Sequence, residues 1–403
     1  MKIECHILQN FPPHCLNRDD TNSPKDCEFG GVRRARISSQ CFKRAVRDAF
    51  EQYQSFSPEF RAVRTKRIVE QVTERLKAKG RNPGQAIGVV IQLLAAVDLK
   101  VELGEDGGTN KTQYLLFLPE RKLEQLAAVA NEHWDALVAA ASPGAEAPAT
   151  AETAKPKGKG KPKAAKTESA LPKEAKAAVE ALLRDARETP EIALFGRMIA
   201  NSPDWNVEAA CQVAQALSTH RVSMEFDFFT AVDDLKGDDT SGSDMMGTVQ
   251  FNSACFYRYA VIDADALQDN LGGTQQAALC KSSIEAFLKA FVHALPTGKQ
   301  NSMAAHTLPS LVLFTVREKG QPVSLANAFI SPVDARTGSL EGESHARLAQ
   351  HFAKLATMYP SDVKGYAASL ETVDWGNAPV TTAASVNELV ATVCANVSTG
   401  AKA

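Results

Sequence analysis

The sequence lacks the features that would assign it at once to a membrane, secreted or nucleotide-binding class. Its 403 residues contain no run of about 18 apolar residues, so no transmembrane helix is expected. The first residues, MKIECHILQNF, lack a signal-peptide pattern and are typical of a strand. No GxxxxGK(S/T) phosphate-binding loop occurs. The formal net charge is −2, so bulk charge predicts neither a nucleic-acid nor a membrane partner, and any basic site must be local.

Paired metal-binding cysteines are absent as well. The eight cysteines include no CxxC pair, which argues against a zinc knuckle or a redox pair. The neighbours Cys5-His6 and His14-Cys15 could supply metal ligands, but buried reduced thiols fit their spacing better. We therefore expect no metal and no other cofactor, and free thiols make a cytoplasmic location the default.

Strand-like and helix-like stretches are interleaved along the chain. Long helical segments lie between the first strand and the later ones, which predicts an α+β fold with an antiparallel sheet and a helical insertion around 58–190. The expected strands are 2–9, 114–119, 221–232, 247–262, 308–317 and 322–330. The expected helices, after one that starts at Ser38 or Ser39, are 61–79, 85–97, 120–141, 172–187, 206–218, 275–295, 340–358 and 383–397.

Residues 142–170 differ from the rest in composition. They read SPGAEAPATAETAKPKGKGKPKAAKTESA and contain no large apolar side chain. Such a segment cannot offset its ordering entropy by burial, so it is predicted to be disordered. A solubilising linker is the favoured interpretation, and contact of its lysines with nucleic acid is the alternative.

Much of the basic charge is concentrated near the amino end. The stretch FGGVRRARISSQCFKRAVR runs from Phe29 to Arg47. Extended back to Lys25, the segment contains seven basic residues and two acidic ones, Asp26 and Glu28, which gives a net charge of +5. Gly30 and Gly31 would let the backbone approach a ligand closely. The helix expected to start at the serines would present free N–H groups that favour anions. The basic residues are Lys25, Arg33, Arg34, Arg36, Lys43, Arg44 and Arg47.

This composition suits a chain of phosphates better than a single small phosphate ligand. A single-stranded polynucleotide could use all the charges, whereas a small ligand would need fewer. A solvated basic helix face without any ligand is the structural alternative.

The two later strands, 221–232 and 247–262, are rich in aromatic residues. They predict a large hairpin with a long polar loop. Aromatic side chains on strands are more often core than base-stacking platforms. Phe228 and Phe229 are neighbours, however, so they point to opposite faces and at least one is exposed if the hairpin projects.

Several ordered motifs resemble the backbone subunit of the type I-E CRISPR surveillance complex, Cascade, known as the CasC family. The similarity covers nearly the whole chain except 142–170. The motifs are HCLNRDD (14–20), PKDCEFGGVRRARISSQCFKRAVR (24–47), LFGRM (194–198), FFTAVDDL (228–235), FYRYA (256–260), NLGG (270–273) and SLANAF (324–329).

The resemblance implies a hand-like protein without catalytic activity, active in antiviral defence. Its parts would be an RRM-like (ferredoxin-like) palm in 1–57 and 191–403, helical fingers in 58–190, and a thumb hairpin at about 219–262. Several copies would stack head to tail on one CRISPR RNA, and each thumb would kink the guide–target duplex. The implied partners are CRISPR RNA, target DNA paired to it, further copies, and the capping, small and large Cascade subunits, with no membrane.

The resemblance also assigns individual residues. Implied contacts to guide-RNA phosphates are Lys25, Ser38, Gln40, Lys43 and Arg47, and the basic charge of the segment adds Arg34, Arg36 and Arg44. Implied wedge residues at the displaced nucleotide are Met198, Phe228, Phe229 and Thr230. Phe228 replaces a more usual tryptophan, and Cys41 replaces a more usual serine.

Two alternatives stay open at the level of the sequence. Related type III backbone subunits cut RNA with a loop aspartate, and Asp19, Asp20 or Asp26 could play that part, as could the pair Asp233-Asp234. Aspartate-rich loops are usually turn formers, however, and Arg18 could pair with its acidic neighbours. The other alternative is an RNA-binding module unrelated to CRISPR.

Overall fold

The computed structural model describes residues 1–104, 109–141, 171–199, 202–231, 245–334, 336 and 338–397. The prediction of disorder for 142–170 concerns residues outside this described part. The chain divides into two compact units. Unit 1 comprises Met1–Phe56, Ala193–Phe195 and Ala209–Ala403, and unit 2 comprises Ser57–Ile192 and Gly196–Glu208.

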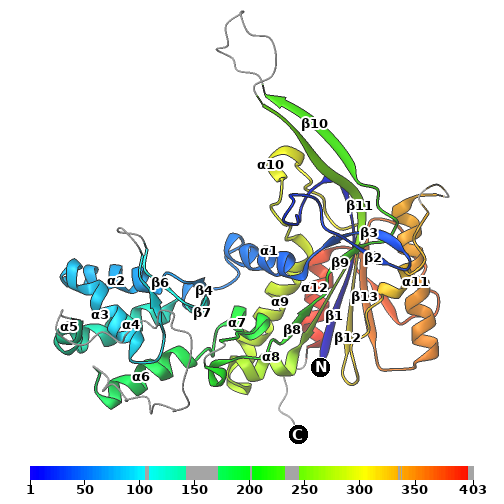
Figure 1. Ribbon diagram of the computed structural model, residues 1–403. Coiled ribbons are helices and arrows are strands. Elements are labelled where there is room, and N and C mark those ends of the chain that lie inside the picture. The colour runs from blue at the N-terminus through cyan, green and yellow to red at the C-terminus, as the bar shows by residue number, and fades with distance from the viewer. Residues whose placement is uncertain are drawn as a thin grey trace, which may run out of the picture. The chain divides into compact units, whose positions relative to one another are not determined.

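Unit 1 is built on a ten-stranded sheet with the order β14-β13-β12-β1-β11-β9-β3-β2, and β8 and β10 pair with other parts of β11 (Figure 1). The pairs are antiparallel except β13 with β14, which makes the sheet mixed. The predicted α+β class is therefore confirmed. The strands are β1 Lys2–His14, β2 Asp26–Phe29, β3 Val32–Ile37, β8 Cys211–Val213, β9 Ala216–Ser218, β10 Glu225–Ala231, β11 Met245–Asp263, β12 Leu311–Arg317, β13 Lys364–Ser369 and β14 Val380–Thr382.

The sheet is covered on both faces. Strand β1 alternates between them, yet consecutive side chains from Ile3 to Leu8 are at most 1% exposed. On one face, α11 packs Leu348 and Phe352 into a core shared with Leu8. On the other, α1 and α9 meet through Phe42 and Phe291, whose rings lie 6.4 Å apart. The helices of unit 1 are α1 Ser39–Gln52, α8 Ala264–Leu271, α9 Ala277–His293, α10 Gln300–Met303, α11 Leu340–Met358 and α12 Val386–Asn396.

Unit 2 is largely helical and has its own hydrophobic core, which includes Leu76, Leu93 and Leu126. Two small antiparallel pairs, β4 with β7 and β5 with β6, complete it. Across the described residues of both units, no helix is long and apolar enough to cross a membrane. The elements of unit 2 are β4 Ala62–Thr65, α2 Ile68–Ala78, α3 Pro83–Ala95, β5 Val101–Glu102, β6 Lys111–Thr112, β7 Leu116–Pro119, α4 Arg121–Glu132, α5 Trp134–Ala141 and α6 Lys173–Arg184. Helix α7 (Pro190–Phe195) has residues in both units.

Several predicted elements were wrong in type or extent. The helix predicted for 206–218 is instead the short strands β8 and β9, which pair with β11. The strand predicted for 322–330 is a loop with one 3-10 turn at Ala326–Phe329. The helix predicted to start at 61 begins at Ile68, after β4. In each case a partner far along the chain decides the backbone conformation, and local periodicity does not record that partner.

Candidate nucleic-acid interface

The first half of the basic segment forms a tight hairpin that the sequence reading missed. Strands β2 and β3 pair from Asp26 with Ala35 to Phe29 with Val32, which leaves Gly30-Gly31 as a two-residue turn. Both glycines have positive φ, 64° and 74°, as such turns require. A Cβ on Gly30 would lie 1.9 Å from the carbonyl oxygen of Ile330. The turn thus packs against the protein, and the idea that Gly30 opens the backbone to a ligand is wrong.

Arg34 is a structural residue, which corrects its prediction as a phosphate contact. Its side chain is among the largest that are fully buried, at 0% exposure. The guanidinium donates to four carbonyl oxygens, those of Phe29 (3.2 Å), Ser218 (3.0 Å), Phe329 (2.6 Å) and Ile330 (3.3 Å). Burial lowers the pKa of Arg34. A guanidinium with its donors so engaged ties the β2–β3 hairpin to the sheet and cannot face RNA.

Three other arginines of the segment lie at the surface with local partners. Arg33 Nε lies 2.9 Å from the Asp26 carboxylate. Arg36 donates to the backbone oxygen of Asp26 (3.1 Å) and to Gln215 Oε1 (2.5 Å). Arg44 forms a long, exposed 3.7 Å pair with Asp48 on α1. Exposed pairs of this kind contribute at most about 1 kcal/mol, so a phosphate could compete for these guanidinium groups.

The start of α1 is assembled by two side chains. Ser38, one of the two serines predicted to cap this helix, is the N-cap, and its hydroxyl accepts from Cys41 N (3.4 Å). Asn17 Oδ1 accepts from Ser38 N (2.8 Å), and the Asn17 carbonyl accepts from Lys25 N (2.9 Å). The first turn of α1 carries no acidic residue. The loop that carries Lys25 is therefore fixed beside the positive end of the helix dipole.

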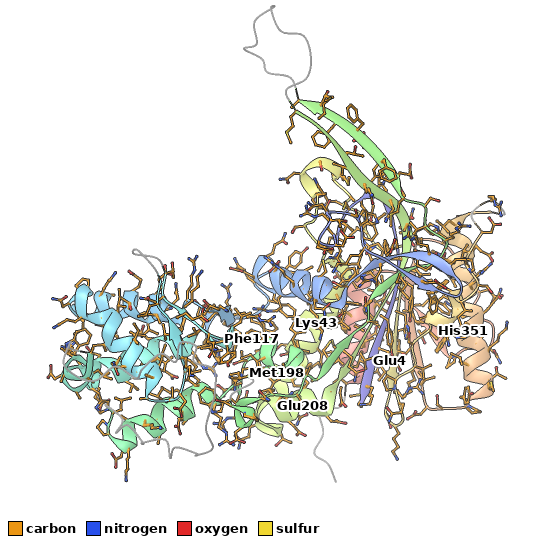
Figure 2. The ribbon with its side chains drawn as sticks, in the orientation of Figure 1. Glu4, Lys43, Phe117, Met198, Glu208 and His351 are labelled. Atoms are coloured by element: carbon orange, nitrogen blue, oxygen red, sulfur yellow. The ribbon has the colours of Figure 1, made fainter. Side chains whose placement is uncertain are left out.

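The outward side of α1 carries polar and basic groups at helical spacing. Gln40, Lys43, Arg44 and Arg47 recur every three or four residues, while Phe42, Ala45, Val46, Ala49 and Phe50 bury the other side. Figure 2 labels Lys43 on this helix. From Gln40 to Arg47 the helix rises about 10 Å, which is long enough for more than one phosphate. We call Lys25, Gln40, Lys43, Arg44 and Arg47 the α1 basic face.

Lys299 joins this region from far along the chain, and the sequence analysis missed it. A Cβ on Gly298 would lie 2.3 Å from the Leu16 oxygen, so the Gly298–Lys299 backbone packs on the loop before Asn17. Burial raises the pKa of Cys15, while the nearby charges of Arg18 and Lys299 oppose that rise. Lys299 has the unusual left-handed φ of 54°. The Gly-Lys step was the available signal, but a separation of more than 280 residues hid its neighbours.

The acidic loop before β2 is a turn. The Asp19 carboxylate accepts from Thr21 N (2.9 Å), Thr21 Oγ1 (2.7 Å) and Ser23 N (2.9 Å), and these bonds lower its pKa. Arg18 donates to Asn22 Oδ1 at 3.1 Å. Within the described ranges, no three His, Cys, Asp or Glu side chains come together as a metal site. The pair Asp233-Asp234 lies outside those ranges.

The aromatic hairpin is formed by β10 and the first part of β11, and it extends beyond the sheet (Figure 1). Its strands confirm the predicted pairing of 221–232 with 247–262, and the loop between them is outside the described residues. Phe228 is 63% exposed and Phe229 is 36% exposed. Both neighbours are thus accessible, on opposite faces, and Thr230 shares the face of Phe228.

Met198, labelled in Figure 2, belongs to unit 2, and its two neighbours in the chain fix the backbone on either side of it. The buried Arg197 donates to the carbonyls of Arg184 (2.7 Å), Trp205 (2.8 Å) and Phe117 (3.5 Å). On the other side, Ile199 N donates to a side-chain oxygen 2.6 Å away, and its side chain lies in the core of unit 2. Met198 itself is 84% exposed. A large apolar side chain is presented to solvent from a fixed backbone.

Comparisons with known proteins agree over the whole chain. The model of the family of CT1975-like proteins matches residues 3–392. A chain of a solved "CRISPR RNA-guided surveillance complex, pre-nicking" matches with a TM-score of 0.84 and 32% identity, over 98% of this chain and 99% of that one. A chain of a second "CRISPR RNA-guided surveillance complex" gives 0.74 and 27%, over 98% and 100%. The search of curated proteins found no match.

The resemblance noted from the motifs is therefore confirmed by two independent kinds of similarity, one of sequence and one of structure. The family model covers almost the entire chain, and the solved relative at 32% identity is matched from end to end. The chain belongs to the CT1975-like family, the CasC backbone subunits of the type I-E CRISPR surveillance complex, Cascade.

Proposed function

We propose that this chain binds CRISPR RNA as a Cascade backbone subunit and holds the phosphates of the guide on its α1 basic face. Family membership makes it a structural, RNA-binding subunit rather than an enzyme. The main support for this residue assignment is the start of α1 at Ser38. There the N-terminal N–H groups of the helix, Lys25 and the outward side of α1 lie next to one another. Phosphate contacts hold a strand without reading its sequence, which base pairing can then do.

The residues of the site would contribute to phosphate binding in different ways. Lys25 and Lys43 contribute charges on partly exposed side chains, and Gln40 is exposed at the helix start. Ser38 is 8% exposed and acts through the cap. Arg36, Arg44 and Arg47 lie beside them, and Lys299 completes the set from the loop before α10. Arg34 is removed from it.

The finer architecture is proposed on the family resemblance and the two units. Unit 1 would supply the RRM-like palm (1–57 and 191–403), with the β10–β11 hairpin as its thumb at about 219–262. Unit 2 would supply the fingers (58–190). Copies would stack head to tail on the guide in the cytoplasm, bound by capping, small and large subunits, and pair the guide with target DNA. Head-to-tail contacts leave an open assembly unless other subunits cap it.

Phe228, Phe229 and Thr230 of the hairpin would act as a wedge at a displaced nucleotide, and the family resemblance gives Met198 of unit 2 a wedge role as well. A phenylalanine has only π faces and edges to offer, so at position 228 it stacks without the hydrogen-bond donor of a tryptophan. The two phenylalanines on opposite hairpin faces give the wedge two sides.

Co-purified RNA tests the function. The chain expressed with its partner subunits and a CRISPR array should retain RNA of uniform length with repeat-derived ends. Heterogeneous cellular RNA would contradict the proposal. Replacing Lys43 and Arg47 by glutamate should release the guide at moderate salt, whereas Phe229→Ala should spare guide retention and impair pairing with target. Equal loss of both activities in the Phe229 variant would show that the wedge is misassigned.

A further inference from the structure

The two faces of the β10–β11 hairpin differ in chemistry. Cross-strand partners share a face, and the register pairs Phe226 with Gln250, Phe228 with Thr248 and Thr230 with Met246. One face therefore carries two phenylalanines and a methionine with small or amide side chains between them. We call it the apolar hairpin face, and its members are Phe226, Phe228, Thr230, Met246, Thr248 and Gln250.

The apolar hairpin face is exposed to an unusual degree. Phe226 is 65%, Phe228 63% and Met246 67% exposed. Single exposed apolar residues are ordinary, but three on one face of a two-stranded ribbon form a contiguous patch that calls for a partner. No motif of the family resemblance assigns Phe226 or Met246.

Charge selects the side on which nucleic acid can lie. Both faces carry exposed apolar side chains, since Phe229 and Met245 (58% exposed) lie on the opposite one, but only the opposite face carries carboxylates, Glu225 and Asp227, both exposed. Carboxylates repel phosphates in a medium that screens charges only over about 10 Å. A phosphate backbone can therefore run at close range along the apolar face, whereas on the acidic face only an uncharged base can come close, at the ring of Phe229. The flat π surfaces of unpaired bases are the uncharged groups that such a strand offers to the apolar face.

Phe229 supports the hairpin from the acidic side. Its ring covers Gly247, because a Cβ built on that glycine would lie 2.6 Å from Phe229 Cζ and 2.8 Å from Cε1. An aromatic ring laid across a cross-strand glycine replaces the packing that the glycine lacks and holds the register of the two strands. Phe229 is also the least exposed of the three phenylalanines on β10. It acts as a positioning residue as well as one side of the wedge.

We propose that the apolar hairpin face is a base-stacking platform that extends past the family wedge residue Phe228, with Phe226 as a second stacking position and Met246 beside the tip. This inference rests on the proposed function. Phe226 and Phe228 lie two residues apart on a strand, about 7 Å, which is roughly twice the spacing of successive nucleotides in a strand. Each ring can therefore meet a different unpaired base of the same strand. The thioether of Met246 adds a polarizable contact that adapts to any base.

The test uses the complete complex with guide RNA and a target strand that carries the fluorescent base 2-aminopurine at successive positions. Phe226→Ala should lower target affinity about tenfold, the loss of one stacked base, and should change the 2-aminopurine signal at one position. Phe228→Ala should change it at a different position. Phe226→Tyr, which keeps the ring, should restore both affinity and signal. Glu225→Gln, a substitution on the opposite face, is the matched control and should not reduce affinity.

The outcomes separate this inference from the function on which it rests. A wild-type complex without CRISPR RNA would overturn both. Guide retention and a Phe228→Ala defect, together with a Phe226→Ala variant as tight as the Glu225→Gln control, would overturn the second stacking position alone. A photo-crosslinking residue in place of Phe226 should attach to nucleic acid, and attachment only to protein would overturn the platform.

Discussion

Replacing Lys25 and Lys43 by glutamine should weaken retention of guide RNA and flatten its dependence on salt. Lys25 lies in the loop beside the start of α1, and Lys43 lies on the outward side of that helix. Among the described residues, neither lysine forms an ion pair. Each phosphate contact on a single strand contributes a slope of about −0.7 to the plot of log affinity against log salt. Losing two contacts should therefore reduce the slope by about 1.4 for each copy of the chain.

The same relation gives the loss of affinity. At about 0.15 M salt, two such contacts together account for a factor of about ten per copy. The difference should shrink as salt rises, because the counterion-release term vanishes near 1 M. The substitutions remove charge without introducing repulsion, so the change in slope counts contacts directly.

The assay follows RNA released from the immobilised complex over a series of sodium chloride concentrations. Lys354→Gln is the control, since it removes one positive charge from an exposed position on α11. It should leave the slope unchanged. An unchanged slope in the double variant, or an equal change in the control, would refute the placement of the guide on the α1 basic face.

Three further predictions concern buried groups. Arg34→Met should lower the free energy of unfolding by at least about 3 kcal/mol, because four carbonyls lose their donor, while guide affinity per folded molecule stays unchanged; denaturant titration and RNA binding at low temperature check the two parts. Burial lowers the pKa of His14 from 6.5 to about 4. As the pH falls through this range the unfolded chain binds a proton that the folded chain does not, so the free energy of unfolding decreases, by about 2 kcal/mol at pH 5. His14→Phe fits between the rings of Phe11 and Phe256 and should remove that part of the pH dependence of unfolding, and an unaltered pH profile would contradict it. Arg197→Lys should loosen the backbone around Met198, seen as faster amide exchange at 196–199 and 202–207, with no change in exchange on α1.

The long amphipathic helices were predictable because their apolar periodicity and their caps are contained within one continuous segment. The helix predicted for 340–358 matches α11, and Ser38 was identified as a possible N-cap from its position before an apolar-periodic stretch. The hairpin was also predictable, since alternation over 221–232 and 247–262 leaves few other structures. Short strands such as β8 and β9 were not, because their pairing with β11, over three and two residues, is decided by a segment some 45 residues away.

The functional residues divide in the same way. Charge density, serines at a helix start and ordered motifs directed attention to the segment from Lys25 to Arg47, and the family followed from them. The sequence did not show which basic side chains of this segment reach the surface and which are buried. Arg34 and Arg36 differ by two positions on one strand, yet one is wholly buried under carbonyls and the other lies at the surface.

Sequence alone determined the class of partner, since composition and motif order are properties of the chain and need no packing. Only the tertiary structure decided which side chains reach that partner. It buried Arg34, brought Lys299 beside the loop before Asn17, laid Phe229 over Gly247 and left Phe226 exposed on the same face as Phe228. The reason is physical: burial and neighbours across a sheet depend on contacts between distant segments, and a linear pattern does not contain them.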